Sequence, residues 1–249
     1  MTTAPEAAAR RGRTRRFLLF GCASAAALGL AAGAGWYLGG AAGGPPADGP
    51  ALAPGHTTGA DGTVIPYGAA GARHTLSVWL DPRCPYCAVV EKGLGTTFKA
   101  LADKGTFRIE YHFATFLDGA LGGKGSKRAL NALGAAVNEG PGKFMAYARV
   151  LFAHQPEEEK DDKFGSTTTL LDLADRVEGL RTPAFNRAVK ELTYLPWAEK
   201  VSSAFYRSGE KGTPVVKLDG RPLDVLSGDG TGSISPEKFT ELVENATHR

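Results

Sequence analysis

Two cysteines separated by two residues, Cys84 and Cys87, are the residues of this sequence best suited to chemistry. Such a pair can close a small disulfide ring within one turn of a helix. The preceding run, Thr75–Leu80, is β-branched and aromatic and predicts a buried strand. The run that follows, to about Leu101, has the apolar spacing of a helix. A Cys-X-X-Cys pair at the junction of a strand and a helix indicates a redox site.

The start of a helix favours the thiolate form of the first cysteine. Helix N-termini carry unpaired N–H groups and about half a positive charge, which together stabilise an anion. In such places the cysteine pKa falls from about 8.5 to between about 3.5 and 7.5. Pro85 suits the first helical turn because it has no N–H and its φ is already helical. We therefore predict that Cys84 is the reactive catalytic cysteine. Cys87, one turn later and more buried, is expected to be the resolving catalytic cysteine.

Two other interpretations of the cysteine pair remain open, namely half of a zinc site and a purely structural disulfide. Tetrahedral zinc needs two more ligands at defined spacing. The only other cysteine is Cys22, in the N-terminal apolar segment, and the five histidines are scattered singly. We therefore favour a redox pair and predict neither a metal site nor a cofactor.

The N-terminus has the features of a membrane anchor. Five arginines within the first sixteen residues precede an uncharged stretch from Phe17 to about Gly44. About twenty apolar residues suffice to span a bilayer, and arginines remain on the cytoplasmic side. We predict a cytoplasmic segment over 1–16 and a single-pass transmembrane anchor over 17–43. This topology places the C-terminal domain outside the cytoplasm, where disulfides persist.

Cleavage of the same segment would give a secreted protein instead. The run Thr14–Leu19, which contains Arg15 and Arg16, resembles a twin-arginine export signal, and Ala32-Gly33-Ala34 offers a small-residue cleavage site. The run Leu19–Cys22 faintly resembles a lipoprotein box, but little apolar sequence precedes Cys22. Both alternatives still export the remainder of the chain.

The charge balance follows the same division. The formal net charge of the chain is +3, and the first sixteen residues carry five arginines and one glutamate, which is +4. The remainder holds 24 basic and 25 acidic residues, which is −1. The basic excess is thus a topology signal, and we expect no nucleic-acid partner.

One domain follows the N-terminal segments. Residues 44–60 are rich in Gly, Pro and Ala and predict an extracytoplasmic linker. Residues 61–246 are enough for one domain with a core. The expected strands are Val64–Pro66, Thr75–Leu80, Phe107–Phe113 and Pro214–Leu218, the last followed by a hairpin turn at Asp219-Gly220. The expected helices between and after them are Lys127–Asn138, Lys143–His154, Thr169–Val177, Pro183–Leu192, Pro196–Ser208 and one that opens at Ser235-Pro236.

This order, a βαβ half and a ββα half with a helical insertion at about 124–208, predicts an α/β thioredoxin-like fold. The chain resembles the DsbA-like thiol-disulfide oxidoreductases, in the branch of membrane-anchored, single-domain bacterial proteins. The resemblance covers about Asp61 to the C-terminus and rests on three runs: Asp81–Cys87, Leu151–Pro156 and Gly212-Thr213-Pro214. It implies that Pro214 follows a cis peptide bond beside the cysteines. It also implies that the Thr213 backbone pairs with an extended substrate, so that Thr213 and Pro214 are substrate-binding residues.

The resemblance implies an enzyme that forms disulfides in exported proteins. Its partners would be exported proteins with cysteines and a membrane redox partner that reoxidises it. A thiol reductase or isomerase, and a non-enzymatic carrier that binds a metal through both thiolates, remain the alternatives. Arg83 is expected either to stabilise the Cys84 thiolate or to be solvated. Glu91 is a weak candidate for a buried proton-transfer acid and is expected to be exposed on its helix.

Overall fold

The computed structural model describes residues 52–247, which fall within the second of two compact units, residues 47–249. The centre of this unit is a five-stranded sheet in the order β1-β3-β2-β4-β5. Its strands are β1 (Ile65–Tyr67), β2 (Thr75–Leu80), β3 (Arg108–Phe113), β4 (Val215–Leu218) and β5 (Arg221–Pro222). Strands β2 and β3 are parallel, and the other neighbours are antiparallel. Since β2 is the middle strand, the cysteines that follow it lie at the middle of one sheet edge.

Apolar side chains alternate along β2 and β3, so that one face of these two strands forms part of the core. Leu76, Val78 and Leu80 are buried, whereas the residues between them are partly exposed. The same alternation in β3 buries Ile109, Tyr111 and Phe113, each of which lies opposite a buried residue of β2. A shift of one residue would expose this apolar set, so the alternation specifies the register.

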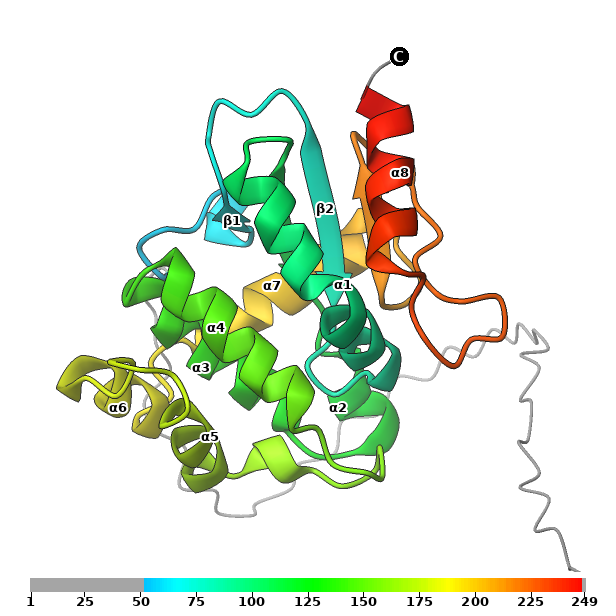
Figure 1. The fold of residues 1–249 in the computed structure, drawn as a ribbon. Coiled ribbons are helices and arrows are strands. Elements are labelled where there is room, and N and C mark those ends of the chain that lie inside the picture. Colours follow the sequence, from blue (N-terminus) through cyan, green and yellow to red (C-terminus); the bar gives the residue numbers. More distant parts are fainter. Residues whose placement is uncertain (1–51, 248–249) are drawn as a thin grey trace, which may run out of the picture. The chain divides into compact units, whose positions relative to one another are not determined.

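Helices cover both faces of the sheet, as Figure 1 shows. Helices α1 (Pro85–Asp103) and α8 (Pro236–Thr247) cover the core face, where the rings of Phe98 and Phe239 lie 4.8 Å apart. Helix α7 (Leu195–Ser208) lies on the other face, where Phe205 meets Trp79 edge to face with ring centroids 6.1 Å apart. Trp79, on the second face of β2, is therefore also packed against a helix.

The helical insertion between β3 and β4 is arranged around one buried helix and shares one hydrophobic core with the sheet. Helix α3 (Gly125–Asn138) is buried at every position from Ala129 to Val137. Its neighbours are α2 (Phe116–Leu121), α4 (Pro141–Ala153), the 3₁₀ helix η2 (Lys163–Gly165), α5 (Thr167–Ala174), α6 (Pro183–Lys190) and α7. Apart from Asn131, the stretch from Ala129 to Val137 is apolar on all sides, so it must be enclosed in this way.

Most of the predicted elements are present within the described residues. The hairpin at Asp219 and Gly220 is confirmed, because both residues have positive φ, 50° and 78°. The N-cap of the last helix is also confirmed, since the Ser235 hydroxyl accepts from the Lys238 N–H at 3.2 Å. The expected start of the insertion at about 124 is too late. Helix α2 precedes it, and its six residues are too few to show helical periodicity.

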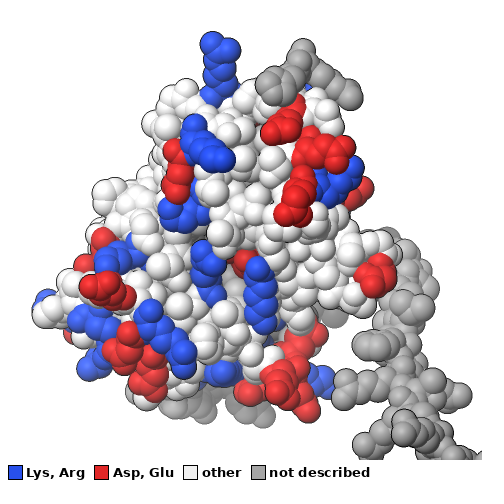
Figure 2. Space-filling model, in the orientation of Figure 1, with Lys and Arg blue, Asp and Glu red and all other residues white. Residues whose placement is uncertain are grey.

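The predicted cytoplasmic segment and membrane anchor lie outside the described residues, as does Cys22. Within residues 52–247, no helix is both long and apolar enough to cross a bilayer. The end of the stretch expected to be a linker contacts the folded unit, because the Gly55 N–H donates to the Asn138 side-chain carbonyl at 2.6 Å. The face shown in Figure 2 carries Lys and Arg interspersed with Asp and Glu.

Candidate active site

Cys84 stands at the junction between β2 and α1. It is the N-cap residue of α1, with an extended backbone (φ −72°, ψ 119°), and Pro85 occupies the first helical position. Its carbonyl accepts the first helical bonds, from the N–H groups of Cys87 at 3.1 Å and Ala88 at 3.2 Å. The sulfur is therefore held at the positive end of a helix of 19 residues.

The surroundings of the Cys84 thiol favour its ionised form. A hydrogen bond from the Cys87 thiol lowers the pKa of Cys84 to about 7, with smaller contributions from the Thr213 side chain and the N–H groups of Cys87 and Tyr86. Burial acts in the opposite direction, since Cys84 is only 5% exposed. The helix start and the second thiol therefore outweigh the cost of desolvating the thiolate.

Cys87 has the opposite properties. Its side chain is fully buried one turn into α1. Burial raises the pKa of Cys87 well above its usual value, and the neighbouring Cys84 sulfur raises it further. Both cysteines are free thiols in this structure. One sulfur is thus prepared to be a thiolate near neutral pH while the other keeps its proton.

A loop from the far end of the chain completes the site. The peptide bond between Thr213 and Pro214 is cis, as expected. Because β4 pairs with β2, with Val215 opposite Trp79, the preceding loop lies beside the cysteines. The Cys84 thiol donates to the Thr213 carbonyl at 3.3 Å. The structure therefore brings together all four residues that the sequence singled out.

A groove continues from this loop along the sheet edge. Its volume is about 460 Å³, and it is lined mainly by apolar side chains of β4, β5 and the segment after them, including Pro214, Val216, Pro222, Leu223, Val225 and Leu226. An extended peptide chain beside Thr213 would find apolar surface in this direction.

Comparison with known proteins agrees with this geometry. A family model described as thioredoxin matches residues 60–245, which is most of the chain. The chain belongs to the thioredoxin family. Comparison with curated proteins gives no match.

Solved structures of thiol-disulfide oxidoreductases share the fold of this thioredoxin-family chain. MdbA from Actinomyces oris is 21% identical, with a TM-score of 0.62, covering 80% of this chain and 91% of that one. BdbD from Bacillus subtilis is also 21% identical, with a TM-score of 0.59 and coverages of 74% and 92%. Reduced DsbA from Mycobacterium tuberculosis is 20% identical, with a TM-score of 0.59 and coverages of 74% and 91%. The expected DsbA-like thioredoxin fold is thereby confirmed.

The expectation that Arg83 is solvated is wrong. Its side chain is buried and points into the helical insertion. The guanidinium donates to Asp118 at 3.1 Å, to the Gly122 carbonyl at 2.7 Å and to the Glu159 carbonyl at 3.3 Å. A second carboxylate, that of Asp162, lies 3.4 Å away. Burial of a guanidinium requires this degree of pairing.

A buried carboxyl group, Asp81, joins the same turn to two helices of the insertion. One oxygen accepts from the Ser126 hydroxyl at 2.6 Å and from the Arg83 N–H at 3.0 Å. The other accepts from the Leu117 N–H at 3.2 Å. Burial raises the pKa of Asp81 to about 6. In the sequence, the only signal for this role is an acidic residue directly after a buried strand.

Glu91 is buried, so the prediction that it is exposed on its helix is wrong. It lies on α1 one turn after Cys87, and burial raises the pKa of Glu91 to about 7, opposed in part by Arg149. Within residues 52–247, its Oε1 atom has no hydrogen-bond partner. Helical periodicity alone does not show how closely α4 covers this position.

No metal-binding arrangement accompanies the cysteines in the described part of the chain. Across residues 52–247, no group of three or more His, Cys, Asp or Glu side chains is placed to hold a metal ion. The chemistry available to the described site is that of two thiols with different pKa values beside a backbone carbonyl.

Proposed function

We propose that this protein is an extracytoplasmic thiol-disulfide oxidoreductase that forms disulfides in exported proteins. Cys84 and Cys87 are its catalytic residues, and Thr213 and Pro214 bind the substrate. The observation that carries the proposal is the difference between the two thiols. The pKa of Cys84 is lowered to about 7 at the start of α1, whereas the pKa of buried Cys87 is raised well above its usual value.

In the oxidised enzyme, a disulfide joins Cys84 to Cys87. A substrate thiolate attacks the Cys84 sulfur, and the bond to Cys87 breaks, which leaves Cys87 as a thiolate that takes up a proton. A second substrate thiolate then attacks the substrate sulfur of this mixed disulfide. Cys84 departs as a thiolate, the substrate has lost two electrons, and the enzyme is a dithiol. A lowered pKa makes Cys84 a good leaving group in this last step.

The lowered pKa of Cys84 also supports the oxidising direction. Stabilising the thiolate stabilises the reduced enzyme, which makes its disulfide a stronger oxidant. Return to the disulfide form then requires a partner that accepts two electrons. We propose a membrane redox partner for this step, because the anchor predicted over residues 17–43 would hold the domain close to the bilayer.

Substrate binding would use the backbone of Thr213. An extended segment that carries a cysteine can pair with this residue as a strand pairs at a sheet edge. Pro214 lacks an N–H, so it leaves space beside the sulfur of Cys84, which lies 3.3 Å from the Thr213 carbonyl. Main-chain recognition of this kind suits an enzyme that must accept many exported proteins.

The test is oxidation of a reduced peptide with two cysteines by the full chain in its disulfide form. We expect formation of the peptide disulfide together with one dithiol enzyme per turnover. Cys84→Ser and Cys87→Ser should each abolish this reaction, because neither variant can form the Cys84–Cys87 disulfide. When Cys87→Ser is instead given a disulfide-bonded peptide, the Cys84 thiolate should attack that disulfide, which forms a mixed disulfide at Cys84 and releases a peptide thiolate. Cys22→Ser is the matched control, because Cys22 is the only other cysteine, and it should react like wild type. An active Cys84→Ser variant would contradict the proposal.

A further inference from the structure

A single side chain from the helical insertion contacts the backbone on both sides of Arg83. Gln155, the only glutamine in the chain, follows α4 directly after His154. Its side-chain nitrogen Nε2 donates to the Pro82 carbonyl at 2.7 Å and to the Cys84 carbonyl at 3.1 Å. Both N–H bonds of the carboxamide are therefore directed at the turn that presents the reactive sulfur.

These two carbonyls differ in what else they bind. The Cys84 carbonyl already accepts from Cys87 and Ala88, the bonds that begin α1. Pro82 is buried, and among residues 52–247 no donor other than Gln155 reaches its carbonyl. Removal of Gln155 would leave a buried carbonyl unpaired, which is unfavourable in a protein interior.

The turn before α1 also contacts the loop that follows α4. Arg83, which lies between the two carbonyls, donates to the backbone carbonyl of Glu159 at 3.3 Å and lies 3.4 Å from Asp162. Asp162 in turn accepts from the N–H groups of Lys124 and Gly125 at the start of α3. The loop after α4 and the turn before α1 therefore hold each other through polar contacts in both directions.

We propose that Gln155 is a positioning residue that sets the reactivity of Cys84 by holding the carbonyls of Pro82 and Cys84. This inference rests on the proposed function, since it concerns the same thiol. The carboxamide fixes the orientation of the turn relative to α1, so that the sulfur stays at the helix start. It also places two N–H dipoles against carbonyl oxygens whose negative ends would otherwise act on the thiolate.

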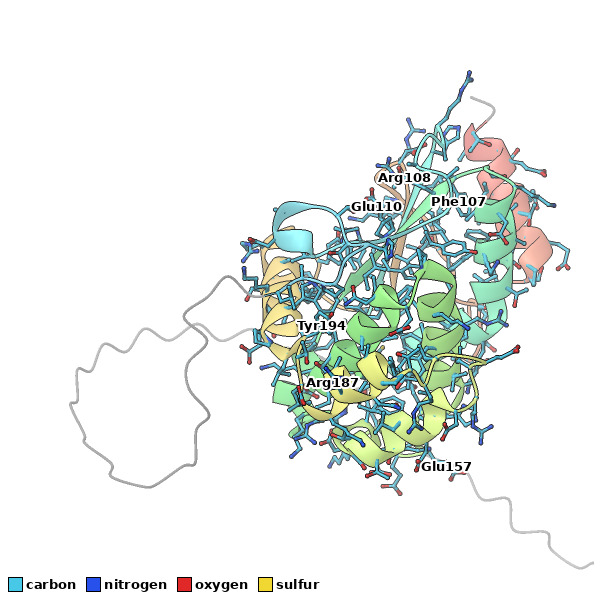
Figure 3. The ribbon with its side chains drawn as sticks, turned by 90° about the vertical axis from the view of Figure 1, so that its left-hand side faces the viewer. Phe107, Arg108, Glu110, Glu157, Arg187 and Tyr194 are labelled. Atoms are coloured by element: carbon cyan, nitrogen blue, oxygen red, sulfur yellow. The ribbon has the colours of Figure 1, made fainter. Side chains whose placement is uncertain are left out.

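The charged groups near Cys84 do not take over the role that we propose for Gln155. Asp81 and Arg83 flank Cys84 on its own turn, and Arg83 is paired with Asp118 and Asp162 of the packed insertion. In the loop after Gln155, the acidic residues from Glu157 to Asp161 are exposed, whereas Asp162 is paired with Arg83. Glu157, labelled in Figure 3, lies at the edge of the molecule. Gln155 is thus the neutral group that reaches the Cys84 backbone from the insertion.

The experiment compares the pH dependence of Cys84 alkylation in the reduced full chain and in three variants. Gln155→Glu keeps the length of the side chain but removes both donors and adds a negative charge. We expect the midpoint of its alkylation profile to rise by about one pH unit, so that the rate one unit below the wild-type midpoint falls about tenfold. Gln155→Ala, which adds no charge, should lower that rate about threefold.

The matched control is Asn186→Ala in α6, which removes a carboxamide that donates to the carbonyl of Arg181, just before this helix, and accepts from the Arg181 side chain. We expect its alkylation profile to coincide with that of wild type. If the Gln155 variants keep the wild-type midpoint while the wild type oxidises a dithiol peptide, this inference is wrong and the proposed function stands. If the wild-type chain oxidises no peptide, the proposed function is wrong, whatever the variants do.

A measurement on the wild-type protein keeps the inference testable if the variants fail to fold. Because Gln155 is the only glutamine, labelling the glutamine side chain with ¹⁵N gives one carboxamide signal. We expect slow exchange of its hydrogens with solvent and a shift of the signal when the cysteines are oxidised. Exchange at the rate of free glutamine would overturn the assignment.

Discussion

The Arg83 guanidinium lies 3.1 Å from the Asp118 carboxylate, both side chains are almost fully buried, and Arg83 directly precedes Cys84 in the chain. The ion pair connects the turn before α1 with α2, an element that belongs to the insertion. The same carboxylate accepts from the N–H groups of Ser126 and Lys127 at the start of α3. The active-site turn is therefore built partly from the insertion, not from the thioredoxin-like half alone.

The first prediction concerns this ion pair. Arg83→Met removes the cation and leaves the buried Asp118 carboxylate without it, so we expect the free energy of unfolding to fall by about 3–5 kcal/mol. The control is Arg108→Met, which breaks a more exposed pair with Glu110 on β3, at the opposite end from Glu157 in Figure 3. That change should cost about 1 kcal/mol or less. Urea unfolding measures the free energy of unfolding of both variants. Equal losses would show that the buried ion pair contributes no more to stability than the more exposed one.

The second prediction concerns the reactivity of the two thiols. In the reduced protein, alkylation of Cys84 should have a midpoint near pH 7, since its pKa is lowered to about 7. Cys87 should remain unmodified there, because its pKa is raised well above the usual value. Mass spectrometry of iodoacetamide-treated protein between pH 5 and 9 separates the two sites. Equal rates at both cysteines would disprove the asymmetry on which the mechanism depends.

The third prediction concerns Glu91 and the pH dependence of stability. Burial raises the pKa of Glu91 from 4.5 to about 7 in the folded protein. Between these values the folded protein keeps a proton that the unfolded chain has released, so stability falls as the pH rises through this window. At pH 8 the total cost is about 3 kcal/mol.

Glu91→Gln should remove this cost because a carboxamide does not ionise. The variant is expected to gain stability relative to wild type as the pH goes from 4.5 to 8. Asp81, whose pKa is also raised, to about 6, is present in both proteins, so its contribution cancels in the comparison. Urea unfolding of both proteins in the disulfide form gives the difference at each pH. A difference that does not change with pH would refute the assignment.

The fourth prediction concerns topology. The arginines before residue 17 and the apolar span over 17–43 predict that the domain is exported. Alkaline phosphatase, which is active only after export, should therefore be active when fused after Arg249. A reporter that works only in the cytoplasm should be inactive at the same position. The reverse result would remove the extracytoplasmic location and, with it, the proposed oxidase role.

Local sequence was sufficient to place Cys84 and Cys87 at the start of a helix and to predict the elements that carry them. Cys84 and Cys87 follow a run of alternating apolar residues and precede a proline-initiated helix, and these are properties of consecutive residues. The hairpin at Asp219-Gly220 was predictable for the same reason. Local sequence was not sufficient to place Thr213 and Pro214 beside Cys84. That position was expected from the family resemblance, and the structure shows it through the pairing of β4 with β2.

Tertiary structure alone decided what surrounds the sulfur. Nothing in the residues next to Arg83 shows that α2 and the loop at 157–162 will cover it, or that α4 will bury Glu91. Gln155 is 71 residues from Cys84, yet its carboxamide binds the Cys84 carbonyl. Helix and strand periodicity reflect which face of an element is apolar, whereas such contacts depend on which distant element packs there. The sequence thus determined the reactive thiols, and the packing of the insertion decided the polar contacts that hold them.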